Sequence, residues 1–153
     1  MSDVPDTLWF SEPFASFGGP ERLDLLDHSE VRSVAAGGTI YEPGDLSAGA
    51  YVLLEGRAEM SDPLMATIGG KPVQVERPGT IVSKASLLEP FEHRHRFSAV
   101  TDCSFLLIPR DAFQARFADG AVFALRLLDH VVVSGSAEVR ELNGAIHSLL
   151  SGS

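Results

Sequence analysis

The residues best suited to chemistry lie in one stretch, residues 79–100, which reads GTIVSKASLLEPFEHRHRFSAV. Its apolar start predicts a strand, and Lys84 to Leu88 predicts a short helical turn that would interrupt a sheet. The first turn of a helix presents backbone N–H groups that can hold an anion. The second half of the stretch is dense in histidine and arginine, so the whole is a candidate anion-binding site. The candidate binding residues are Ser83, Lys84, Ala85, Ser86, His93, Arg94 and His95.

The alternation of side chains in the second half predicts which of them face inward. His93 and His95 have the same parity as apolar Phe97, so we expect these three side chains to share the inner face of a strand. Arg94 and Arg96 would then lie on a solvated outer face. A register slip of one residue would turn Arg94 inward as a phosphate clamp and Phe97 outward, and the sequence leaves this alternative open.

Metal binding and catalysis are weaker interpretations of the same residues. Two histidines at i and i+2 could ligate a metal, but no carboxylate follows at short spacing and no later Gly-rich motif supplies a third histidine. One or both could instead be hydrogen-bonded wall residues. The serines lack a nucleophile-elbow signature, and Cys103 lies in an apolar run typical of a core, where a free thiol is inert. The sequence therefore predicts no catalytic residue, no metal and no cofactor, and hence no enzyme.

Composition narrows the class of protein. The chain has 153 residues, 44% hydrophobic and 22% charged, which is typical of one globular domain. Its formal net charge of −9 would repel nucleic acid. The N-terminus lacks a signal-peptide pattern, no apolar run reaches the length of a membrane span, and the single cysteine suits a reducing compartment. We expect a soluble, cytoplasmic protein that binds neither nucleic acid nor membrane.

The elements that would position the candidate residues are mostly short strands. Residues 1–30 predict an N-terminal helical segment, residues 31–109 a β-roll, and residues 110–150 C-terminal helices, all within one domain covering 1–153. Gly and Pro punctuate the middle region at regular spacing, which favours an antiparallel β-roll of the jelly-roll type, mainly β with flanking helices. The predicted strands are 31–35, 38–42, 50–55, 57–60, 65–68, 72–76, 80–82, 94–100 and 104–108.

Four motifs in this order resemble the cyclic-nucleotide-binding domain family, the sensor half of catabolite-activator-type regulators. They are GGTIYEPGD, AYVLLEGRAEM, the PG before the candidate stretch, and TDCSFLLIPRDAF. The resemblance covers roughly residues 31–150. It implies that residues 79–100 correspond to the family's phosphate-binding cassette, with Ser86-Leu87-Leu88 in the place of its Ala-Leu-Leu.

The cassette departs from the family pattern at its polar positions. The family's glycine falls on Ser83, the glutamate that receives the ribose hydroxyl on Lys84, and the phosphate-clamping arginine on His93. Lysine has no acceptor, and imidazole cannot offer a charged bidentate fork. Each lost charge-assisted bond costs roughly 1.5–3 kcal/mol. The resemblance therefore implies a degenerate cassette that does not bind cyclic AMP or cyclic GMP in the standard way.

Two functions remain open at this point. The chain could be a stand-alone regulatory module that senses an atypical anionic small molecule. Alternatively, it could be a ligand-free structural or interaction module that contacts a partner protein or its own copy.

The last predicted helix runs for about thirty residues from Ala121 with a heptad-like apolar stripe. We expect the first half of the stripe to pack on the β-roll. The second half would lie beyond the roll, since such a helix is about 45 Å long, and the resemblance implies a homodimer through this helix. The seam is Leu125, Leu128, Val132, Gly135, Val139, Leu142, Ile146 and Leu149, and the predicted dimer interface is the seam from Leu128 onward.

Overall fold

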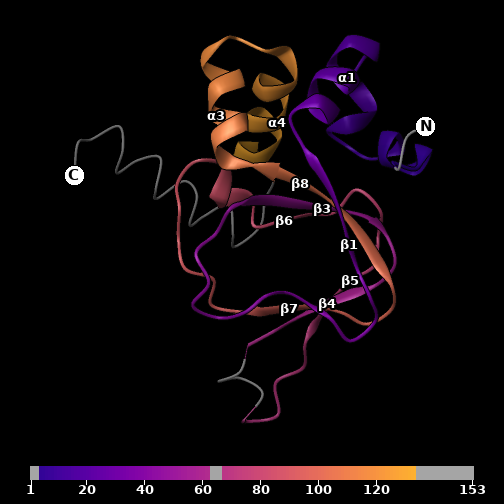
Figure 1. Cartoon of the computed structure of the whole chain (residues 1–153), viewed down its shortest axis with the longest axis vertical. Helices are drawn as coiled ribbons and strands as arrows, with labels where there is room; N and C mark the ends of the chain where they lie inside the picture. Colours follow the sequence, from indigo (N-terminus) through magenta and orange to yellow (C-terminus); the bar gives the residue numbers. More distant parts are fainter. Residues whose placement is uncertain (1–3, 63–66, 134–153) are drawn as a thin grey trace, which may run out of the picture.

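The molecule consists of two antiparallel sheets with a group of helices at one end (Figure 1). The computed structural model describes residues 4–62 and 67–133. The N-terminal part forms two 3₁₀ turns, η1 (Asp6–Phe10) and η2 (Phe14–Ser16), and helix α1 (Gly19–Asp27). After the strands come α3 (Arg110–Ala118) and α4 (Val122–Val133), which lie beside α1 (Figure 1).

The strands form two four-stranded sheets within the described part of the chain. One has the order β1-β8-β3-β6 and the other β2-β7-β4-β5. Each of these eight strands lies within two residues of a predicted one, so the expected antiparallel β-roll with flanking helices is confirmed. The predicted strand 65–68 begins among residues outside the described ranges, and residues 67–68 lie in a turn. The strands are β1 (Glu30–Val34), β2 (Thr39–Tyr41), β3 (Gly49–Glu55), β4 (Ala58–Ser61), β5 (Val73–Val75), β6 (Ile81–Val82), β7 (Arg96–Ala99) and β8 (Cys103–Pro109).

The first sheet is covered on both faces. Val52 and Leu106 pack on the helix side, whereas Leu53 and Phe105 pack inside the roll. Because both faces are buried, β3 and β8 are almost continuously apolar and do not alternate. The second sheet turns only its inner face toward the interior of the roll, where Phe97 is fully buried.

Helix α4 buries a different stripe from the predicted seam. Phe123, Ala124, Leu127 and Val131 are buried against the helix-side cluster. Leu125 and Val132 are exposed, and Leu128 is only half-buried. The expectation that the first half of the seam packs on the β-roll is therefore wrong for Leu125 and Val132. The reason is that α4 packs on α1 and α3, which rotates its buried face by about one residue.

The rest of the predicted long helix lies outside the described residues. This part includes five of the predicted interface positions, which are Gly135, Val139, Leu142, Ile146 and Leu149. In the described residues, none of the helices has the length and apolar character that crossing a membrane requires.

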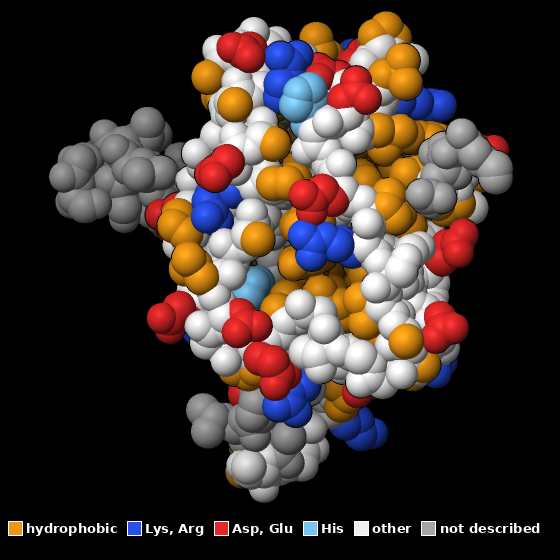
Figure 2. Space-filling view, viewed as in Figure 1, with side chains coloured by type: hydrophobic (Ala, Val, Ile, Leu, Met, Phe, Trp, Pro, Cys, Tyr) orange, Lys and Arg blue, Asp and Glu red, His pale blue; other side chains and the backbone are white. Residues whose placement is uncertain are grey.

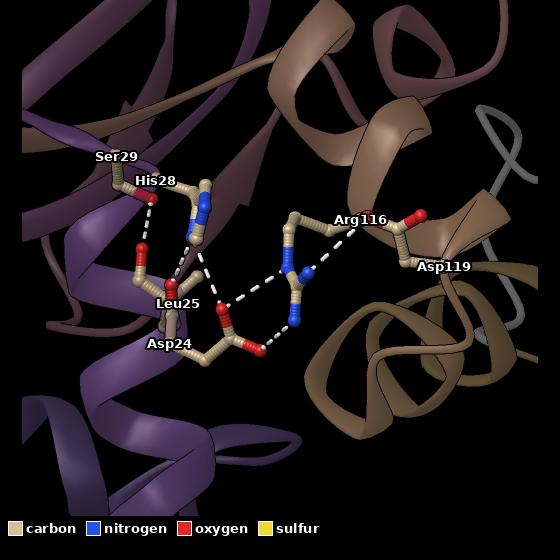
Figure 3. A network of polar contacts seen from close by, with 6 residues as sticks. All are labelled: Asp24, Leu25, His28, Ser29, Arg116 and Asp119. Carbon is tan, nitrogen blue, oxygen red and sulfur yellow. Dashed lines mark hydrogen bonds and ion pairs between the residues drawn. The ribbon is translucent and has the colours of Figure 1, made fainter.

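A polar network joins α1 to α3 (Figure 3). Arg116 donates to both carboxylate oxygens of Asp24, over 2.8 and 3.2 Å. The same carboxylate lies 3.0 Å from Nδ1 of His28, whose ring stacks on Phe123 of α4. The network therefore fixes the N-terminal helix to both C-terminal helices on the outside of the roll.

Candidate functional site

The candidate stretch begins as a strand and turns sharply at Ser83. β6 pairs with β3, and the predicted helical turn is confirmed as η3, a 3₁₀ turn over Lys84–Leu87. Ser83 precedes it in the left-handed conformation, with φ 64° and ψ 42°. Its buried hydroxyl lies 3.3 Å from the hydroxyl of Tyr41 on β2. The position that holds glycine in the family pattern therefore keeps a glycine-like backbone although its side chain is serine.

His93 lies inside the roll and packs face to face on an aromatic ring. It is 5% exposed, its ring centroid is 3.5 Å from that of Tyr41, and the two planes are 9° apart. Phe91 approaches its edge. The backbone holds the position as well, because His93 N–H donates to the Asp45 carbonyl and His93 C=O accepts from Gly44.

Burial lowers the pKa of His93, the Asp45 carboxylate opposes this shift, and His95 adds to it. A buried neutral imidazole offers one N–H and one acceptor nitrogen, and no charge. His93 therefore differs chemically from a phosphate-clamping guanidinium in both charge and number of donors.

The prediction that His93 and Phe97 point inward agrees with their burial, whereas His95 is not fully buried and β7 begins only at Arg96, after both histidines. His93 and Phe97 face inward, His95 is half-buried, and Arg94 and Arg96 are exposed. The slipped register, with Arg94 inside, is therefore excluded. Arg96 pairs with Glu42 across the sheet at 2.6 Å, and that hydrogen bond raises the pKa of Arg96.

Helix α3 holds the helical turn in place. Arg110 donates to the hydroxyl of the fully buried Ser86 over 3.2 Å and to the backbone carbonyl of Ser47 over 2.9 Å. Gln114, one helical turn later, donates to the carbonyls of Leu87 and Leu88. Neither residue was among the site residues predicted from the sequence. Their i, i+4 spacing would have placed them on one face of the predicted helix, but nothing in the sequence marked Ser86 as their partner.

Lys84 lies in surroundings that differ from those of His93. It lines a surface cavity between the N-terminal segment, the turn at Arg77–Thr80 and α4, and His93 is not among the residues lining that cavity. Inside the roll, the ring of Tyr41 contacts those of Tyr51, His93 and Phe97. Among the described residues, the buried polar side chains are three serines and this histidine.

The described residues do not assemble a catalytic group. Asp24 and His28 form a carboxylate–imidazole pair, but the neighbouring Ser29 hydroxyl donates to the Leu25 carbonyl and not to the imidazole (Figure 3). Burial raises the pKa of the Cys103 thiol, which disfavours the nucleophilic thiolate. Within the described ranges, no three His, Cys, Asp or Glu side chains come together to hold a metal.

The surface shows mixed charge on the face in view. Lysine and arginine side chains are interspersed with aspartate and glutamate on this face and do not form one basic patch (Figure 2). This side of the molecule therefore has no continuous positively charged surface on which a polyanion such as DNA could bind.

The chain is similar to one known protein family and to several solved structures. Residues 31–119 match the family model of the cyclic nucleotide-binding domain. No curated protein sequence matches the chain.

Several solved structures share the fold at low sequence identity. The N-terminal domain of a transcriptional regulator from Streptomyces coelicolor is similar with a TM-score of 0.67 and 21% identity, over 92% of this chain and 95% of that one. A putative cyclic nucleotide-binding protein from Geobacter metallireducens has a TM-score of 0.66 and 20% identity, over 95% and 98% of the two chains. The catabolite activator protein of Thermus thermophilus has a TM-score of 0.64 and 22% identity, over 89% of this chain and 60% of that one.

Proposed function

The chain belongs to the cyclic nucleotide-binding domain family, and from this premise we propose that it is a regulatory module that does not bind cyclic AMP or cyclic GMP in the usual way. It responds instead to a different small anion. The observation that carries the proposal is the contact between His93 and Tyr41. At the position of the family's clamping arginine, a neutral imidazole is stacked on a ring 3.5 Å away inside the roll.

Two physical effects oppose binding of an ordinary cyclic nucleotide at this position. Replacing a guanidinium by a neutral imidazole and a carboxylate by Lys84 removes two charge-assisted bonds, each worth roughly 1.5–3 kcal/mol. Two such losses weaken affinity by about two to four decades. In addition, a ligand would have to displace the His93 ring from Tyr41 and lose their stacking.

Isothermal titration at physiological salt tests the proposal. We expect no binding of cyclic AMP with a Kd near 1 μM. The triple variant Ser83→Gly, Lys84→Glu, His93→Arg restores the family's polar positions and is expected to bind more tightly than the wild type. Micromolar binding by the wild type would contradict the proposal. A folded triple variant without any gain would show that other positions block the site.

A second candidate function is that of a ligand-free interaction module that associates with its own copy or a partner protein. The exposed apolar side chains of α4 favour it, because Val122 and Leu125 are each 46% exposed and Val133 is 69% exposed. Thermal melting against a panel of nucleotides and phosphate esters separates the two functions. A specific ligand at 100 times its Kd adds about 2.7 kcal/mol of stability, whereas a ligand-free module melts at the same temperature throughout.

A further inference from the structure

A cavity of about 440 Å³ lies on the outside of the roll, where three parts of the chain meet. Phe10 to Glu12 form one wall and Arg77 to Ile81 another. The lining is completed by Lys84, the first residue of η3, and by His130, in the last turn of α4. Its volume is within the range of about 300–1,000 Å³ typical of small-molecule sites.

The lining is rich in basic side chains although the protein as a whole is acidic, with a net charge of −9. Arg77, Lys84 and His130 come from three different elements, and Glu12 is the only acidic residue among those that line the cavity. Burial lowers the pKa of His130, and the charge of Lys84 lowers it further, while Glu12 and Asp129 act in the opposite direction. Lys84 and His130 line the same cavity, so an anion bound there would lie near both residues.

The wall opposite α4 is held in a fixed shape. The Ser11 hydroxyl donates to the Pro78 carbonyl over 2.9 Å, which ties the N-terminal segment to the turn before β6. Gly79 has φ +91°, and a Cβ there would lie 2.5 Å from the Cβ of Ser11, so no larger residue fits between the two segments. This part of the cavity wall is therefore defined by packing between the two segments.

The remaining lining is apolar. Phe10 is 76% exposed although it carries a large ring, and Pro78 and Ile81 lie on the same cavity. An exposed phenylalanine beside basic groups offers a surface on which a flat ring can stack while its charged group reaches the cations.

From these observations we propose that the cavity binds a small phosphate ester that carries a flat ring. Arg77, Lys84 and His130 hold the phosphate, because all three line the cavity and their side chains are of the types that donate hydrogen bonds to an oxyanion. Phe10 and Ile81 contact the ring. The two proposals share Lys84, but the lining of this outer cavity does not include His93, whose contact with Tyr41 carries the proposed function.

Nuclear magnetic resonance titration of the full chain with phenyl phosphate tests the proposal. We expect binding with a Kd of about 1 mM or lower. The largest shift changes should be at the Gly79, Thr80 and Lys84 amides and the His130 ring, with little change at Tyr41 and His93. Inorganic phosphate should bind at the same residues more weakly, and phenol, which lacks the charge, should cause no change there.

Two charge reversals and a matched control complete the test. Arg77→Glu and Lys84→Glu should each weaken phenyl phosphate binding at least ~10-fold, whereas Arg57→Glu, an equal charge change at an exposed position outside the cavity lining, should not. Shift changes centred on Tyr41 and His93, equal effects of all three variants, or no shift changes would each overturn the proposal. Failure of the proposed function has a different signature, which is micromolar cyclic AMP binding in the calorimeter.

Discussion

At the scale of single residues, the surroundings of His93 inside the roll are defined mainly by one ring pair. Tyr41 and His93 stack with their planes 9° apart, and Ser83 contacts the Tyr41 hydroxyl. Tyr41 of β2, Ser83 before η3 and His93 before β7 thus form a packed unit. Aromatic contacts of this kind contribute about 0.5–1.5 kcal/mol beyond simple burial, so opening the unit for a ligand has a cost.

The backbone of Ser83 provides the first prediction at this scale. A non-glycine residue in the left-handed region costs roughly 1–2 kcal/mol. Ser83→Gly removes that strain and loses the contact with Tyr41, whereas Ser83→Ala loses the contact and keeps the strain. We expect the glycine variant to be more stable than the alanine variant by about 1 kcal/mol, measured by urea denaturation. An alanine variant of equal or greater stability would contradict the conformation described for Ser83.

The lowered pKa of His93 predicts a pH dependence. Because its folded pKa is below the unfolded value, the unfolded chain binds more protons between the two values, and stability falls as pH drops below about 6.5. A single such group contributes a slope of up to about 1.4 kcal/mol per pH unit. His93→Gln should therefore flatten the loss of stability between neutral and acidic pH.

Because the variant also loses packing against Tyr41 at every pH, the test compares how steeply the free energy of unfolding of each protein changes with pH. Denaturant titrations at several pH values measure this slope. His130, whose pKa burial also lowers, remains in the variant and leaves a residual slope. Identical slopes for wild type and variant would show that His93 does not titrate differently on unfolding.

At the scale of elements, the helical turn η3 depends on α3 for its position. Arg110 and Gln114 donate to Ser47, Ser86 and the carbonyls that end the turn. Movement of α3 would therefore pull on the turn directly through hydrogen bonds. The contact links helix α3 to the turn that follows Ser83.

Replacing Arg110 tests this coupling. Arg110→Met keeps a long side chain but removes the donors, leaving the buried Ser86 hydroxyl without its partner. We expect the free energy of unfolding to fall by roughly 1–3 kcal/mol, and hydrogen exchange at the Ser86 and Leu88 amides to become faster. Arg57→Met, at an exposed position, serves as the control and should change neither quantity. Unchanged exchange in the turn would mean that α3 does not restrain it.

At the scale of the whole molecule, the helices leave apolar surface that the described residues do not cover. The buried stripe of α4 faces α1, α3 and the sheet, and Leu125, Val132 and Val133 remain exposed. A second copy of this helix is the partner that the predicted seam implies, and exposed leucine and valine at seam spacing suit such a contact.

Light scattering coupled to size exclusion tests the association. We expect a homodimer at tens of micromolar protein, converted to monomer by Leu142→Glu and weakened by Leu125→Glu, because each places a carboxylate in the seam. Leu125 is 46% exposed, so its variant should keep the fold. Ala115→Glu, on the exposed surface of α3, is the matched control and should stay dimeric. A monomeric wild type would contradict the prediction.

The sequence by itself determined the strands, the helical turn and the direction of the side chains in the candidate stretch. These features depend on local rules. Side chains alternate along a strand, and glycine and proline end it, so the burial of Phe97 and the exposure of Arg96 in β7 follow from their positions. The motifs shared with the cyclic nucleotide-binding domain were likewise visible without coordinates.

The tertiary structure decided which residues meet. Nothing near His93 in the sequence indicates that Tyr41 lies on its ring, because that contact follows from the packing of the roll. Packing also places Lys84 on an outer cavity beside His130, and turns Phe123 and Leu127, and not Leu125, toward the core. The physical reason is that spacing sets the direction of a side chain within its own element, whereas its partners depend on how distant elements pack together.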